Sequence, residues 1–89
     1  MGKEIRGCYV GDLLSNVMGK AKEGDAWITV MGNINAIAVA LLTKAACIIL
    51  CENAQLDEDA KRRAAEKEVP VLLSPLPAFS LALEIARLL

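Results

Sequence analysis

The sequence contains no histidine and very few aromatic residues: one Trp, one Tyr and one Phe among 89 residues. Without histidine, the chain lacks the commonest general base near neutral pH, every Ser–His or Cys–His nucleophile pair and the commonest metal ligand. Ten basic and eleven acidic side chains leave the net charge near zero. With neither a basic patch nor aromatic stacking surfaces, the sequence does not predict nucleic-acid binding.

Signals for membranes and export are also missing. The longest apolar runs are interrupted by Lys44 and by polar turns, so no segment is long enough to span a bilayer. The N-terminus lacks the charged-then-apolar layout of a secretory signal. Three cysteines without an export signal favour reduced thiols and a cytoplasmic location.

The cysteines do not predict a metal or cofactor site. Cys47 and Cys51 lie four residues apart on one predicted strand, hence about 13 Å apart. That separation excludes a shared ion or a disulfide between them. We therefore expect no metal and no cofactor, and Cys47 and Cys51 to be small buried hydrophobic side chains.

What the sequence has in abundance is aliphatic side chains. Residues of the apolar classes make up 55% of it, and residues 34–43 form a predicted helix without any charge. A helix that is hydrophobic all round must be covered on all sides. A domain of this size buries only roughly 60–65% of its unfolded surface. The composition therefore predicts self-association, most simply as a homodimer.

Apolar and helical patterns alternate along the chain at short spacing. Strands are predicted at residues 5–10, 26–30, 46–51 and 70–74. Helices are predicted after Asp12, over 34–43, over 58–67 behind Asp57, and from Pro77 onward. The two middle strands are apolar throughout, as in parallel strands buried on both faces. We expect one domain over residues 1–89, a three-layer α/β/α fold with a small, mainly parallel sheet of about four strands in βαβαβαβα order.

The helices differ in their outer faces. The third carries acids first and bases later, with pairs at i, i+4 spacing, and is expected to face solvent. The last has one narrow polar stripe, formed by Ser80, Glu84 and Arg87. The uncharged helix and the last helix are therefore the expected dimer surfaces, through Ile37, Val39, Ala40, Leu42, Leu81, Ile85 and Leu88.

The carboxyl ends of the strands are where open α/β sheets bind ligands. The candidate ligand-binding residues at these ends are Gly11, Asp12, Gly32, Asn33, Asn35, Cys51, Glu52, Asn53 and Ser74. The turn at Gly32 is the best candidate, since glycine permits close approach and free N–H groups at a helix start can hold an anion. The alternative is that Asp12, Asn33 and Asn35 are helix caps.

Two segments, GDLLSNVMGKAKEGDAWIT and VPVLLSPLPAF, together with the apolar helix and strand between them, resemble the DRTGG domain family. The likeness is greatest to its short stand-alone members, which are related to the N-terminal domain of HPr serine kinase. The resemblance implies a regulatory or ligand-sensing domain rather than an enzyme. Related domains are fused to nucleotide-sensing CBS domains and to phosphotransacetylase, which suggests an adenine nucleotide as ligand and an enzyme as partner.

The family's signature residues are replaced in this chain. Its Asp-Arg pair aligns with Asn33 and Ile34, and its Thr-Gly-Gly with Cys51, Glu52 and Asn53. Stand-alone relatives carry a further N-terminal helix and strand, so we expect a truncated version or one domain of a longer protein. A phosphate-binding P-loop is absent, because Gly19-Lys20-Ala21 lacks the upstream glycine and the hydroxyl.

Three hypotheses follow. The first is a non-catalytic regulatory or ligand-sensing module that self-associates. The second is a domain that binds an adenine nucleotide or small anion and controls a partner enzyme. The third, ranked last, is an enzyme that uses Cys51.

Overall fold

The computed structural model describes residues 4–89, in which strands and helices alternate strictly. The elements are β1 (Gly7–Val10), α1 (Leu14–Lys20), β2 (Asp25–Thr29), α2 (Ile34–Thr43), β3 (Cys47–Leu50), α3 (Glu58–Lys67), β4 (Val71–Leu73) and α4 (Ala78–Leu88). The strands form one parallel sheet in the order β1-β2-β3-β4. The predicted small α/β fold is confirmed.

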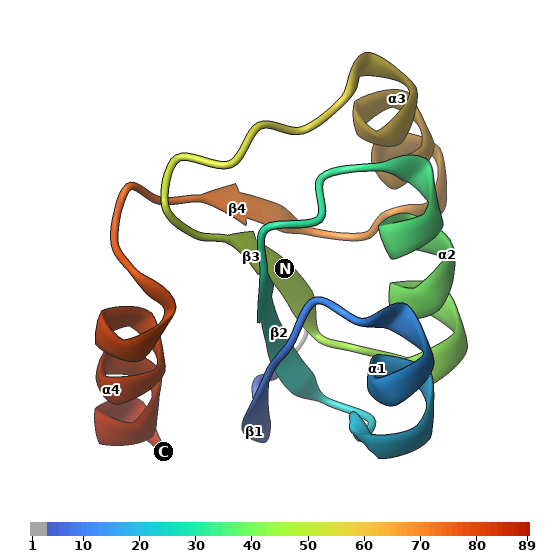
Figure 1. Cartoon of the computed structure of the whole chain (residues 1–89). Coiled ribbons are helices and arrows are strands. Elements are labelled where there is room, and N and C mark those ends of the chain that lie inside the picture. Colours follow the sequence, from blue (N-terminus) through green and yellow to red (C-terminus); the bar gives the residue numbers. More distant parts are fainter. Residues whose placement is uncertain (1–3) are drawn as a thin grey trace.

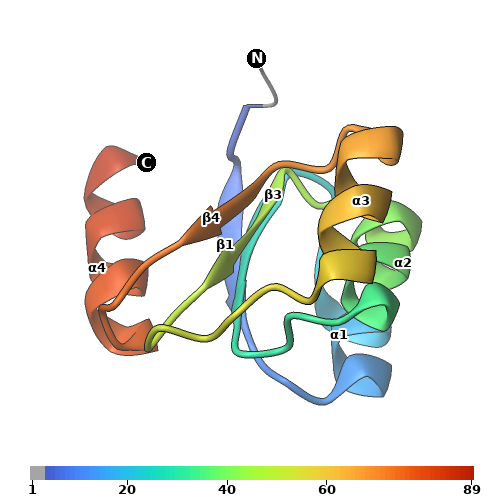
Figure 2. The same ribbon diagram turned by 90° about the horizontal axis from the view of Figure 1, so that it is seen from above.

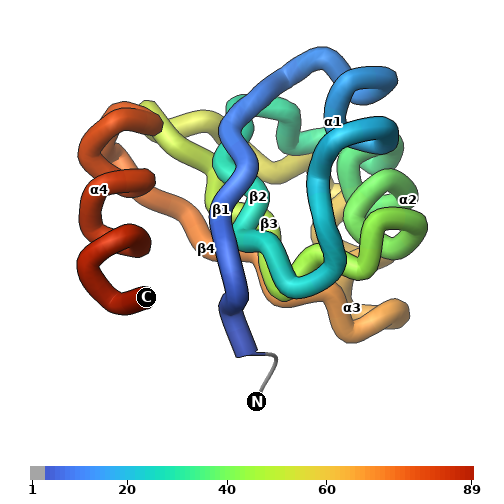
Figure 3. Tube along the Cα trace, turned by 90° about the horizontal axis from the view of Figure 1, so that it is seen from below, coloured from blue at the N-terminus to red at the C-terminus, as the bar shows by residue number. Residues whose placement is uncertain are grey.

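The helices are divided unequally between the two faces of the sheet. α1, α2 and α3 lie on one face and α4 lies alone on the other (Figures 1 and 2). Crossovers between sequential parallel strands are right-handed, which places the three connecting helices on the same side. α2 packs between α1 and α3, whereas α4 packs on β1 and β2. The view from below shows the same separation of α4 from the other helices (Figure 3).

The face covered by three helices holds the larger core. Its fully buried side chains include Trp27, Ile37, Ile48 and Leu50. The Trp27 indole N–H donates a hydrogen bond to the Gly11 carbonyl oxygen at 2.9 Å. All residues of β2 and β3 are buried, as predicted for internal parallel strands.

The opposite face is covered only in part. Ala26, Ile28, Ile49 and Ile85 pack there with the cysteines beneath α4. Leu72 of β4 pairs in register with Ile49 and so stands on this face. It remains 52% exposed. One helix therefore leaves part of an apolar sheet face open.

Four of the residues expected at a dimer interface lie inside the chain's own core. These are Ile37, Val39, Ala40 and Ile85. That part of the prediction is wrong, because α1, α3 and the sheet already surround most of α2 and the sheet receives Ile85 of α4. The remaining three are still accessible: Leu42 and Leu88 are exposed and Leu81 is half-buried.

The helix ends also differ from expectation in detail. The Asn33 side chain caps α2 by accepting the Ala36 N–H at 3.0 Å, whereas Asp57 makes no side-chain cap bond to α3. The ion pairs of α3 are at i, i+3 spacing: Arg62 with Asp59, and Arg63 with Glu66. Within residues 4–89, no helix has the length and apolar character needed to cross a membrane.

Candidate functional site

The turn after β1 is tied to the end of β2 by Asp12. Its Oδ1 accepts hydrogen bonds from the Thr29 hydroxyl at 2.6 Å and from the Val30 N–H at 2.9 Å. The Thr29 Oγ1 in turn accepts the Met31 N–H at 3.2 Å. Asp12 thus joins two strand ends and does not cap α1, which begins after Leu13 without a side-chain cap.

Gly32 is required by a neighbouring loop. A Cβ at this position would lie 1.9 Å from the Gln55 carbonyl oxygen. The Gly32 carbonyl oxygen accepts the Asp57 N–H at 2.8 Å. The loop between β3 and α3 therefore crosses directly over this turn, and the space that glycine leaves is filled by protein backbone.

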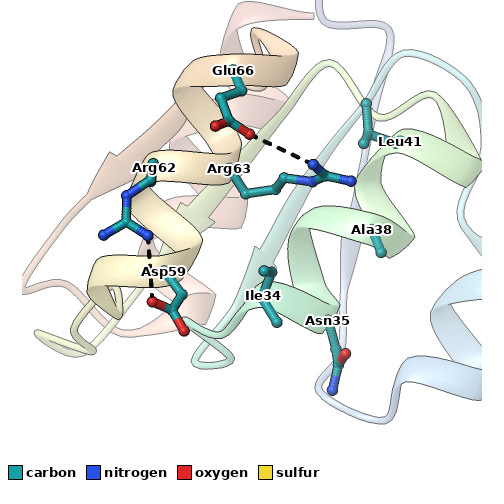
Figure 4. A pocket seen from close by; sticks show the side chains of 8 residues that line it. All are labelled: Ile34, Asn35, Ala38, Leu41, Asp59, Arg62, Arg63 and Glu66. Atoms are coloured by element: carbon teal, nitrogen blue, oxygen red, sulfur yellow. Dashed lines mark ion pairs between the residues drawn. The ribbon is translucent and has the colours of Figure 1, made fainter.

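Asn35 lies in the first turn of α2, and its side chain is exposed. It borders a groove of about 460 Å³ between α2 and α3. In Figure 4, Ile34, Ala38 and Leu41 line this groove from α2, and paired charged side chains line it from α3. Of the predicted ligand-binding residues, Asn35 alone lines this groove.

Cys51 is buried at the end of β3. Its thiol donates to the Thr29 carbonyl oxygen, with Sγ and O 3.7 Å apart. Burial raises the pKa of this thiol, and the nearby negative charge of Glu52 raises it further. A nucleophilic cysteine needs a depressed pKa, so this environment does not activate Cys51.

Glu52 and Asn53 both have left-handed backbone conformations, with φ of 56° and 60°. The Glu52 N–H donates to the Leu76 carbonyl oxygen at 2.9 Å. The Asn53 N–H donates to the Ser74 carbonyl oxygen at 3.0 Å. This turn thus holds the segment that leads from β4 to α4.

A pocket of about 500 Å³ opens between this turn, the first turns of α3 and the end of β4. Its polar and charged lining is formed by Asn53, Gln55, Glu58, Lys61 and Ser74. Only Asn53 and Ser74 were predicted. Lys61 supplies the positive charge that the strand-end turns lack, and it was missed because a strongly charged helix is expected to face solvent.

A family profile that matches nearly the whole chain identifies the family. The sequence profile of the DRTGG domain matches residues 3–88. The chain belongs to the DRTGG domain family. Domains of this family are generally regulatory. Searches among curated proteins and among solved structures found no match.

The two residues that are expected, from the resemblance, to stand where the family has its glycine pair are Glu52 and Asn53. Both have positive φ in this structure. Glycine adopts such a conformation without steric penalty. Asparagine also tolerates it, so Glu52 is the less favourable residue of this turn. Within residues 4–89, no group of three or more His, Cys, Asp or Glu side chains is arranged to hold a metal ion.

Proposed function

We propose that this DRTGG domain is a non-catalytic regulatory module that associates with a second copy of itself through α4. The observation that carries the proposal is the apolar surface of this helix. Phe79 is 78% exposed and Leu83 is 41% exposed. Phe79 and Leu83 are four residues apart and share one side of the helix.

The exposed area is sufficient for a weak dimer. Large apolar side chains are exposed on one side of α4 and on the segments before it, at Leu72, Leu76, Phe79 and Leu83. Leu88 is nine residues from Phe79 and therefore on the opposite side of the helix. At about 100 Å² each, these four side chains offer on the order of 400 Å² per copy. Two copies would then bury about 800 Å², which is the size of a weak, transient interface.

Sedimentation equilibrium of matched variants tests this proposal. Leu83 of α4 and Leu41 of α2 are 41% and 38% exposed. Leu83→Glu should weaken self-association by at least about tenfold, because it places a charge in the apolar contact. Leu41→Glu should leave association unchanged. A wild-type chain that is monomeric at about 100 μM, or equal effects of both variants, would overturn the proposal.

A second candidate function is the binding of a small anion or an adenine nucleotide, through which the domain would control a partner enzyme. The pocket beside the Glu52–Asn53 turn supports it. Its volume of about 500 Å³ lies within the range of small-molecule sites. Lys61 offers a positive charge, while Ser74 and Asn53 offer hydrogen-bonding groups.

Thermal-shift measurements with ATP, ADP and inorganic phosphate test this second function. A ligand at 100 times its Kd should stabilise the fold by about 2.7 kcal/mol. Lys61→Gln should weaken binding, whereas Lys67→Gln, at the far end of α3 and outside the pocket lining, should not. No shift with any of the three compounds would contradict it.

A further inference from the structure

The turn at Glu52 and Asn53 is unusual for its backbone. Among residues 4–89, four residues other than glycine have positive φ. Lys44 and Glu68 are single residues at the C-terminal ends of α2 and α3, where a left-handed residue is ordinary. Glu52 and Asn53 are consecutive, and both side chains are exposed. Two adjacent left-handed residues are the centre of a tight turn, for which glycine and asparagine are favoured and glutamate is not.

The turn is closed on itself by the Ala54 N–H, which donates to the Cys51 carbonyl oxygen at 3.0 Å. Its other two N–H groups bind the segment that leads to α4. The N–H groups of Glu52 and Asn53 bind the carbonyl oxygens of Leu76 and Ser74. These acceptors belong to the Ser74-Pro75-Leu76-Pro77 segment, in which the two prolines have no N–H to donate. The Leu76 N–H is occupied by the Ser74 hydroxyl at 3.1 Å. The segment is therefore held at the β3 end largely through its carbonyl groups.

The path of this segment determines where α4 lies. After β4, at one edge of the sheet, the chain must reach β1 and β2 at the other side. Figure 2 shows the segment passing near the end of β3 before it enters α4. The two hydrogen bonds act at this passage. Asn53, Ser74 and Pro75 also line the 500 Å³ pocket, so a bound molecule would touch both halves of the contact.

We infer that the Glu52–Asn53 turn is a clamp that fixes the position of α4 and thereby controls the surface through which copies of this chain associate. The part that concerns association rests on the proposed function. The effect on α4 itself does not, because it is a property of the single chain.

Hydrogen exchange of α4 tests the clamp. Asn53→Pro removes one N–H, forbids positive φ at residue 53 and disfavours the left-handed conformation of Glu52. Exchange of the α4 amides should become about tenfold faster, as expected for the loss of two hydrogen bonds. Exchange in α2 should not change.

The matched control is Glu68→Pro. Glu68 has φ of 58°, and its N–H is bound within the end of α3. This variant should leave α4 unaffected. The clamp would be overturned if Asn53→Pro accelerated hydrogen exchange equally in α2 and α4. It would also be overturned if exchange of the α4 amides stayed as slow as in the wild type.

If Asn53→Pro does not fold, the milder variant Asn53→Gly tests the clamp. Asn53→Gly relaxes the turn and should slow α4 exchange by about threefold relative to α2, whereas Glu68→Gly should not. No selective slowing would contradict the inference. Measuring exchange also in the Leu83→Glu background separates the clamp from self-association, since sedimentation alone reports the latter.

Discussion

The two faces of the sheet differ in how completely the chain covers them. Three helices cover one face, and the side chains beneath them, including Trp27 and Ile37, are fully buried. A single helix lies on the other face, where Leu72 remains half exposed and Phe79 points largely to solvent. The first face has what a small domain needs for stability. The second has apolar surface left over, which is a property of interaction sites.

The difference follows from the strand order. Sequential parallel strands place every connecting helix on the same side, so only a helix after the last strand can reach the other side. α4 is about as long as α2, yet it must cover a whole sheet face alone. We therefore expect substitutions on the two faces to have different consequences, on stability for the first and on association for the second.

The largest expected effect belongs to the three-helix face. Ile37→Ala should lower the free energy of unfolding by about 2–5 kcal/mol, because it leaves a cavity in the core. Leu88→Ala, at an exposed position of α4, should change it by less than about 0.5 kcal/mol. Urea denaturation measures both. If the two variants lowered the free energy of unfolding by similar amounts, the two faces would not differ in their contribution to stability.

A slightly smaller effect is expected where the strand-end loops cross. Gly32→Ala should destabilise the fold by about 2 kcal/mol, since the new Cβ would collide with the Gln55 carbonyl oxygen. Gly19→Ala is the matched control, because nothing lies within 4 Å of its added Cβ. In a helix, that change should stabilise the fold by about 0.5–1 kcal/mol. Equal changes in thermal denaturation would contradict this role of Gly32.

The sequence predicted the elements well because their periodicity depends on local burial. The boundaries of α2 and α3 agree with prediction, as does the continuous burial of β2 and β3. The same periodicity could not show what buries an apolar helix. Neighbouring helices of the same chain and a second copy would leave the same pattern, which is why Ile37 and Val39 were assigned to an interface.

The candidate site was harder to predict because it depends on loop paths. Strand ends identified the region correctly as a place for polar turns. The closure of the Gly32 turn by the 54–57 loop is a long-range backbone contact without a sequence signature. Likewise, Lys61 lines the pocket because the first turns of α3 lie beside the 53–56 loop and the end of β4. The reach of Asp12 to Thr29 also required knowledge that β1 and β2 are neighbours.

The next prediction compares the stability of variants at Asn33 and Asn35, to test whether Asn33 acts as a helix cap or as a ligand-binding residue. Asn33→Ala should destabilise the domain by about 1 kcal/mol, since it removes the side-chain cap of α2. Asn35→Ala, two residues further on and at an exposed position, should change stability by less than about 0.5 kcal/mol. Chemical denaturation distinguishes them. Loss of nucleotide binding in Asn33→Ala without loss of stability would show that a ligand role outweighs the cap.

The smallest expected effect concerns the α4 face and its response to pH. All three thiols, Cys8, Cys47 and Cys51, pack in the cluster beneath α4. Burial is the main cause that raises the pKa of each. The unfolded chain therefore ionises its thiols first, near their ordinary pKa of about 8.5. Below that pH their contribution to stability is fully present, and it is lost as the pH rises through the raised pKa values of the folded state.

The variant with Cys8→Ala, Cys47→Ala and Cys51→Ala is the control for this pH dependence. Lysine and tyrosine titrate in the same alkaline range, so the thiols are measured by the difference between wild type and variant. Urea midpoints should fall more steeply above about pH 8.5 in the wild type. If the thiols act on the α4 face, hydrogen exchange in α4 should accelerate at that pH before exchange in α2. If the urea midpoint falls with pH equally steeply in the two proteins, the thiols do not cause the pH dependence. If the exchange rates of α2 and α4 rise together, the two faces of the sheet open as one unit.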